Sequence, residues 1–148
     1  MMEPMILQLI AMDLDEQRMI SGYPIGGNIH LMIGDIYFPE EGWYDLVSAD
    51  FENWIPRLIS FARKHTDTCE LGFMDGPCKA KFERKTSGAV QVVCLWNHQL
   101  QIPETEIDFP GFVESVCACL RKYNRILYEN NFSAQFVDEL NALRNLHF

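Results

Sequence analysis

The chain has 148 residues, of which 48% are apolar and 22% charged, and this length and composition predict one domain with a full hydrophobic core. Its net charge of -9 disfavours nucleic acid as a partner, because phosphates repel an acidic surface. No apolar run is long enough to span a membrane, and the run at 5–12 follows Glu3 rather than the basic segment of a signal peptide. We therefore expect a single soluble, cytoplasmic globular domain over residues 1–148, with no membrane partner.

Alternating apolar and polar residues predict three strands in the first third of the chain. The apolar run 5–12 predicts the first strand. Residues 28–38 alternate and predict the second strand, with a bulge at Gly34. Residues 43–47 predict a short third strand after a turn rich in proline and glycine.

Near Asp50 the spacing of apolar residues changes to that of an amphipathic helix. Its apolar face consists of Phe51, Trp54, Ile55, Leu58, Ile59 and Ala62. Ser48 or Asp50 is a candidate N-cap. Pro56 lacks a backbone donor, so it predicts either a kink or a helix that begins near Asn53. We expect the apolar face of this helix to be buried against a sheet.

The second half of the chain predicts three more strands and two more helices. The strands lie at 68–73, 78–82 and 90–96, and a helix at 108–128 precedes the third helix, which follows a break at 130–131. The predicted order is β-β-β-α-β-β-β-α-α. It is an α+β fold in which an antiparallel sheet of about five or six strands carries three helices on one face.

Most of the net charge lies in the first 60 residues, which carry ten acids and two bases, against eleven acids and ten bases in the remainder. The densest stretch contains Asp35, Glu40, Glu41, Asp45, Asp50 and Glu52, with no lysine or arginine among them. Its aromatic residues are Tyr37, Phe38, Trp43, Tyr44 and Phe51. An acidic face set with aromatic rings suits a basic protein partner. We therefore predict partner binding at Glu40, Glu41, Trp43, Tyr44, Asp45 and Asp50.

No motif for catalysis or for a cofactor competes with this acidic stretch. The histidines are scattered, and His30 lies on an alternating strand where we expect it to face solvent. Cys94 and His98 have the residue types of a nucleophile and its base, but we favour a buried thiol beside an exposed imidazole. The acidic turn at 40–45 has oxygen ligands for a divalent cation without the spacing of a calcium loop. We predict a protein that is not an enzyme and that binds no metal or cofactor.

The cysteines have an odd number and an irregular spacing, which argue against a disulfide framework. They are Cys69, Cys78, Cys94, Cys117 and Cys119. We expect buried, reduced thiols with no native disulfide.

One block of the chain resembles a known group of proteins. The block consists of Phe38-Pro39-Glu40-Glu41-Gly42-Trp43-Tyr44-Asp45, then Trp54, then Phe73-Met74-Asp75-Gly76-Pro77. It is similar to small immunity proteins of bacterial polymorphic toxin and contact-dependent inhibition systems. In one such group a Phe-Pro-x-x-x-Trp-x-Asp segment precedes a helix with a tryptophan and a Phe-x-Asp-Gly hairpin. Each part of the block also has a structural explanation, as a core anchor or a turn.

The resemblance implies a cytoplasmic protein without enzymatic activity that binds a cognate toxin domain and occludes its active site. Nuclease toxins are commonly basic, so the charge of the chain agrees with this implication. Two alternatives stay open. One is a small adaptor or regulatory domain that binds another protein, and the other is a small enzyme that uses an acidic pocket and a metal.

Overall fold

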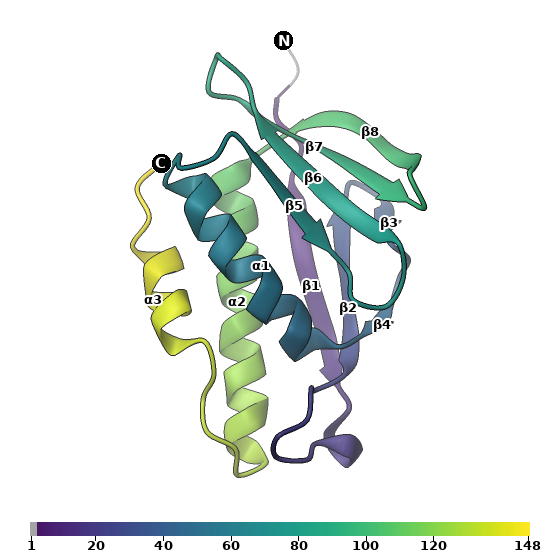
Figure 1. Ribbon diagram of the computed structural model, residues 1–148, viewed down its shortest axis with the longest axis vertical. Coiled ribbons are helices and arrows are strands. Elements are labelled where there is room, and N and C mark those ends of the chain that lie inside the picture. Colours follow the sequence, from purple (N-terminus) through teal and green to yellow (C-terminus); the bar gives the residue numbers. More distant parts are fainter. Residues whose placement is uncertain (1–2) are drawn as a thin grey trace.

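Two antiparallel sheets and three helices make up residues 3–148, which the computed structural model describes apart from the side chain of Met12 (Figure 1). In the first sheet, β2 (Gly27–Ile33) pairs with β1 (Leu7–Leu14) on one side and with β3 (Ile36–Phe38) and β4 (Tyr44–Asp45) on the other. The second sheet has the order β5 (Thr68–Gly72), β6 (Cys78–Arg84), β7 (Val90–Trp96) and β8 (Gln99–Ile107). The helices are α1 (Val47–Ala62), α2 (Phe109–Glu129) and α3 (Val137–Arg144), and the 3-10 turn η1 spans Glu16–Arg18.

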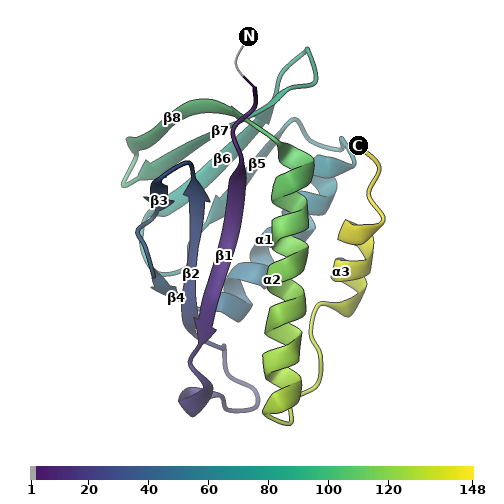
Figure 2. The same ribbon diagram turned by 180° about the vertical axis from the view of Figure 1, so that it is seen from behind.

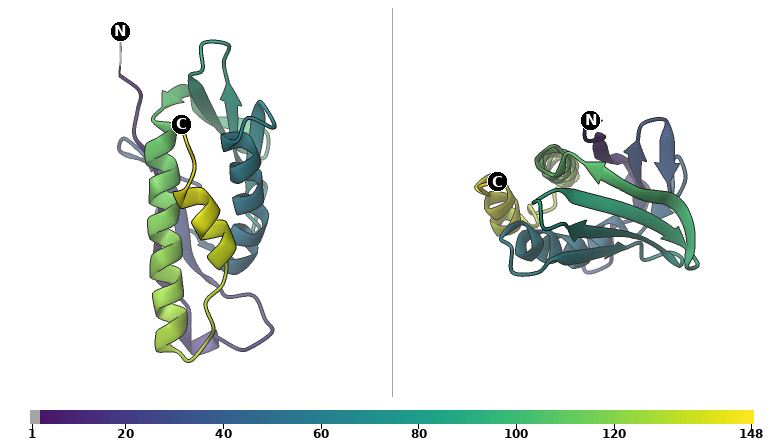
Figure 3. Two further views of the ribbon diagram at one scale, coloured as in Figure 1. Left: turned by 90° about the vertical axis from the view of Figure 1, so that its left-hand side faces the viewer. Right: turned by 90° about the horizontal axis from the view of Figure 1, so that it is seen from above.

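The helices gather on one side of the molecule and cover one edge of each sheet, at β1 and at β5 (Figures 2 and 3). α2 runs along β1, where the Leu9 N–H donates to Ser115 Oγ at 2.9 Å and the Cys119 thiol donates to the Leu9 carbonyl at 3.2 Å. α1 lies beside β5, and Trp54 Nε1 donates to the Gly72 carbonyl at 2.7 Å. These bonds use polar groups at sheet edges that would otherwise be open to pairing with another chain.

Met5 joins the two sheets just before β1 begins. Its N–H donates to the Glu106 carbonyl and its carbonyl accepts from the Asp108 N–H, both at 2.9 Å. This parallel bridge to Ile107 places the start of the chain beside the end of β8. Because α2 follows β8 directly, the bridge also fixes where α2 begins.

The class α+β and the presence of three helices confirm the sequence prediction, and the order of elements matches it approximately. The predicted burial of α1 is also confirmed, since Trp54, Ile55 and Leu58 are at most 2% exposed. The structure differs in having two sheets instead of one. Alternation identifies strands, but it does not specify which strands pair.

The predicted second strand is in fact the hairpin of β2 and β3. Ile33 pairs with Ile36, so Gly34 and Asp35 form a two-residue turn, and the φ of Gly34 is 57°. Glycine adopts this positive φ without a steric penalty, which favours a turn over the predicted bulge.

Helix α1 begins earlier than the sequence predicts. It starts at Val47, its N-cap is Leu46, and no side chain caps it. Ser48 Oγ instead accepts from the Ile25 N–H at 2.7 Å, so the first predicted cap bonds to another segment. Pro56 lies inside the helix on its exposed side, where water can reach the carbonyl that the missing N–H leaves free.

The five cysteines are buried and free, in agreement with the prediction of buried thiols. Burial raises the pKa of Cys69 and of Cys94 to about 12 in each case. Within residues 3–148, no helix is long and apolar enough to cross a membrane.

Candidate functional site

The six residues predicted to bind a partner lie at two depths. Glu40, Glu41 and Tyr44 are exposed, and Trp43 is half-buried. Asp45 and Asp50 are 1% and 0% exposed, so their carboxyl groups lie beneath the surface. Glu40, Glu41, Tyr44 and part of Trp43 can therefore contact a partner directly. Asp45 and Asp50 instead form hydrogen bonds within the protein.

Asp45, at the end of β4, connects three segments. Its Oδ2 accepts from Trp43 Nε1 at 3.0 Å, and its Oδ1 accepts from the Leu46 N–H at 2.7 Å and from the Asp75 N–H at 3.1 Å. Such bonds to N–H groups stabilise a buried carboxylate. The negative charge also lies next to the start of α1, where the helix dipole favours it.

Asp50 lies in the first turn of α1 and faces the same buried site. Its Oδ1 accepts from the Met74 N–H at 3.0 Å. Burial, and then the nearby Asp45 carboxylate, raise the pKa of Asp50 to about 8. Among the described residues, Asp50 Oδ2 has no hydrogen-bond partner. The bond from the Met74 N–H explains why Asp50 does not act as the predicted cap.

The turn that carries Glu40 and Glu41 is held from below by β2. Asn28 Nδ2 donates to the Gly42 carbonyl at 2.7 Å, and the Gly42 N–H donates to His30 Nδ1 at 3.2 Å. His30 is buried, which corrects the expectation that it faces solvent. Burial lowers the pKa of His30, so its ring is neutral and Nδ1 is an acceptor.

Trp43 packs its ring edge-on against Trp96 of β7, with ring centroids 5.3 Å apart. Its indole nitrogen also donates to Asp45, so Trp43 is held by a ring contact and by a hydrogen bond. It contributes to the fold and leaves part of its ring at the surface.

A pocket of about 250 Å³ opens beside these residues, lined by Tyr44, Asp45, Leu46, Met74 and Asp75. Three of its apolar side chains are exposed: Tyr44 by 45%, Leu46 by 39% and Met74 by 52%. We call the exposed residues Glu40, Glu41, Tyr44, Leu46, Met74 and Asp75 the acidic pocket face. Sequence patterns missed Leu46 and Met74, because the sequence alone does not distinguish an exposed apolar residue beside a strand or helix from a core residue.

Three carboxylates of this region influence the same thiol. Burial first, and then Asp45, Asp75 and Glu40, raise the pKa of Cys78 to about 11. Glu40 therefore lies near enough to Asp45 and Asp75 to contribute to one local negative potential. Among the described residues, no group of three histidine, cysteine or acidic side chains has the geometry to hold a metal ion.

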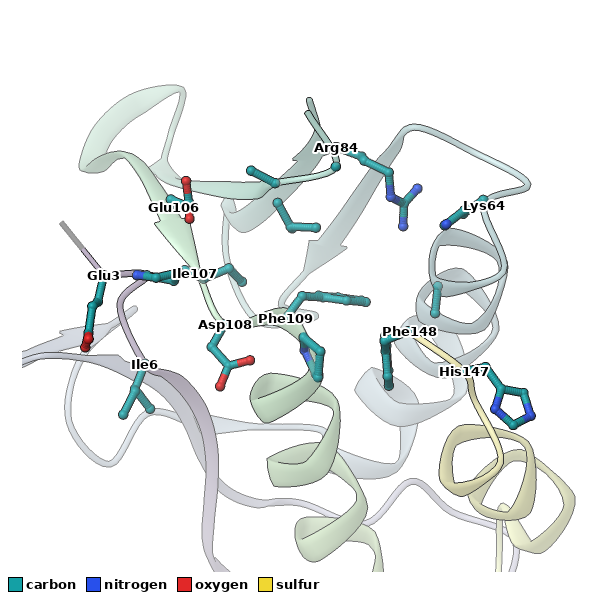
Figure 4. A pocket seen from close by; sticks show the side chains of 16 residues that line it. Glu3, Ile6, Lys64, Arg84, Glu106, Ile107, Asp108, Phe109, His147 and Phe148 are labelled. Atoms are coloured by element: carbon teal, nitrogen blue, oxygen red, sulfur yellow. The ribbon is translucent and has the colours of Figure 1, made fainter. Parts of the chain in front are cut away.

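A larger pocket of about 750 Å³ lies at the other end of the molecule, near the start of the chain and the end of α1 (Figure 4). Its lining contains no serine, threonine or cysteine. Cys94 and His98, the candidate nucleophile and base of the sequence, differ in depth, since Cys94 is fully buried and His98 is exposed.

Comparisons of the chain with models of protein families, with curated proteins and with solved structures give no match.

Proposed function

We propose that the chain is a cytoplasmic inhibitor of the immunity type, which binds a basic toxin domain through the acidic pocket face and has no enzymatic activity. The observation that carries this proposal is the pocket of about 250 Å³, which combines exposed apolar side chains with carboxylates. Apolar anchors in a pocket slow dissociation, and surrounding charges speed the encounter with an oppositely charged partner.

The charge distribution supports the choice of a basic partner. The first 60 residues contribute -8 of the net charge of -9, since they carry ten acids and two bases. Glu40, Glu41 and Asp75 are exposed, and no lysine or arginine occurs between Asp35 and Glu52. A cationic side chain of the partner can lay its carbon chain against Tyr44 and Met74 while its charge meets carboxylates.

Hydrogen bonds to buried carboxyl groups support one part of the pocket before any partner arrives. The buried carboxyl groups of Asp45 and Asp50 accept from the N–H groups of Asp75 and Met74, the two residues that form its outer wall. A preorganised loop loses little conformational entropy on binding, so more of the contact energy appears as affinity.

The proposal is tested with the product of the large reading frame directly upstream of the gene, since immunity genes follow their toxin genes. Its C-terminal domain should arrest growth when expressed alone, and co-expression of this chain should restore growth. The two purified proteins should form a complex. An upstream product that is harmless, or a complex that does not form, contradicts the proposal.

A matched pair of variants tests whether the partner binds to the acidic pocket face. Met74→Lys puts a positive charge into the acidic pocket face, and Leu100→Lys makes the same change at an exposed apolar residue of β8. We expect Met74→Lys to abolish protection and Leu100→Lys to retain it. If both variants protect equally, the acidic pocket face is not the docking surface.

A further inference from the structure

The pocket of about 750 Å³ has two walls of opposite charge (Figure 4). Lys64, Arg84 and His147 lie on one side, and Glu3, Glu106 and Asp108 lie on the other. Phe109 and Phe148 lie between the walls, with ring centroids 5.9 Å apart, and Ile107 and Val90 extend this apolar floor. The volume falls within the range of roughly 300–1,000 Å³ that is usual for small-molecule sites.

The basic wall is built around an immobilised guanidinium. Arg84 donates to the Phe61 carbonyl at 2.6 Å and to the Thr66 carbonyl at 3.2 Å. Its guanidinium carbon lies 4.2 Å from the centroid of the Phe61 ring. Within the described residues, neither Arg84 nor Lys64 forms an ion pair. Lys64 is exposed, and Arg84 keeps N–H donors beyond those that the two carbonyls use, so both cations can meet an anionic group.

The carboxylates of the acidic wall likewise have no ion-pair partner among the described residues. Glu3 and Glu106 form no ion pair within the part of the chain that the structure describes. Asp108 caps α2 by accepting from the Gly111 N–H at 3.1 Å, so its position is fixed. The apolar floor separates the two walls and prevents them from neutralising each other.

The balance of charges indicates what kind of ligand fits. The lining holds two permanent cations and three carboxylates. A ligand with a single charge is therefore attracted by one wall and repelled by the other. A molecule with opposite charges at its two ends and an apolar body is attracted by both walls and buries the apolar floor. We propose that this pocket binds a short apolar peptide with free ends. Its carboxylate faces Lys64 and Arg84, and its ammonium group faces Glu3 and Glu106.

The test uses tri-leucine as the probe, with the full chain and isothermal titration calorimetry. Tri-leucine should bind saturably. Amidation of its C-terminus and acetylation of its N-terminus should each weaken binding by about three- to tenfold, because each removes one charge. Failure of tri-leucine to bind, or equal affinity for the free and the capped peptides, overturns the proposal.

Two variants assign the ends of the peptide to the walls. In Lys64→Gln the penalty for amidation should shrink while the penalty for acetylation persists, and in Glu106→Gln the reverse should hold. Lys81→Gln and Glu129→Gln are the matched controls, because both residues lie outside this pocket. Arg84 is left intact since it supports two backbone carbonyls. Penalties that do not change in either variant overturn the assignment, and unchanged melting temperatures show that the variants are folded.

Discussion

Asp45 and Asp50 are two buried carboxyl groups that hold the same loop, since Asp45 accepts from the Asp75 N–H at 3.1 Å and Asp50 accepts from the Met74 N–H at 3.0 Å. Asp45 accepts hydrogen bonds from Trp43, Leu46 and Asp75, whereas within residues 3–148 Asp50 accepts from Met74 alone. The smaller number of donors at Asp50 agrees with the raised pKa of its carboxyl group, because N–H donors stabilise the ionised form. The pair holds the 73–76 loop against the start of α1, so it links the stability of the fold to the shape of the acidic pocket face.

The first prediction concerns the pH dependence of stability. The folded-state pKa of Asp50 is about 8, raised from 3.8, so the folded state binds one proton more than the unfolded state between these values. Its contribution to stability is therefore complete below about pH 4 and is lost as the pH rises through about 8. Between pH 5 and 8 the loss should be on the order of 3 kcal/mol.

Asp50→Asn should remove this dependence while keeping the shape of the site, since an amide can accept from Met74 and donate to Asp45. We expect the variant to be more stable than the wild type at pH 8.5, with a difference that shrinks towards pH 4, measured by urea unfolding. Glu52→Gln, at an exposed position of the same helix, is the control. A wild-type minus Asp50→Asn difference that is constant with pH would contradict a protonated Asp50.

The second prediction concerns the thiols. Burial raises the pKa of Cys119, like that of Cys78, to about 11, and both thiols are more than nine-tenths buried. Because the thiolate is the reactive form, the native protein should react slowly with a disulfide reagent at pH 8. After unfolding without reductant, titration should count five thiols. A count of three or fewer would reveal a disulfide.

The third prediction concerns Trp54, which packs against Phe73 with ring centroids 5.0 Å apart and bonds to the Gly72 carbonyl. Trp54→Ala should lower the free energy of unfolding by about 3–5 kcal/mol, because it leaves a cavity in the core. Trp54→Phe retains much of the ring and loses the hydrogen bond, so its cost should be about 1–2 kcal/mol. Equal costs for the two variants in urea unfolding would mean that packing contributes little.

Periodicity predicted the three helices and most of the strands, but it did not predict β8 as a separate strand or the depth of the polar residues. Trp54, Ile55 and Leu58 were identified as core because helical spacing places them on one face, and this inference needs only local sequence. Asp45 and Asp50 lie in a run of acids that looks like a solvated surface. Each carboxyl group accepts from a distant residue, 30 positions later for Asp45 and 24 positions later for Asp50, so no local pattern reveals that they are buried.

The side of the sheet that His30 faces could not be predicted for a related reason. Alternation places His30 opposite Ile29 and Leu31, yet all three are buried because β2 has contacts on both faces. Its ring meets the ring of Tyr37 at 5.2 Å and bonds to the turn at Gly42. A strand that is covered on both faces loses the relation between alternation and exposure.

The last prediction concerns the rates of partner binding and rests on the proposed inhibitor function. Glu40 and Glu41 are exposed and make no hydrogen bond or ion pair through their side chains within residues 3–148, so reversing their charge leaves the fold intact. Glu40→Lys with Glu41→Lys should lower the association rate constant with a basic partner by about tenfold or more at low salt. The effect should shrink as salt rises, because ions screen exposed charges beyond about 10 Å at 0.1 M.

The dissociation rate should change much less, since long-range attraction acts mainly on the encounter and short-range contacts decide how long the complex lasts. The control is Glu114→Lys with Glu129→Lys on α2, which changes the net charge equally at exposed positions outside the acidic pocket face. Surface plasmon resonance at several salt concentrations measures both rates. If the two double variants slow association equally, only the net charge of the molecule matters. If neither slows it, the acidic residues serve solubility, and docking must occur on another surface.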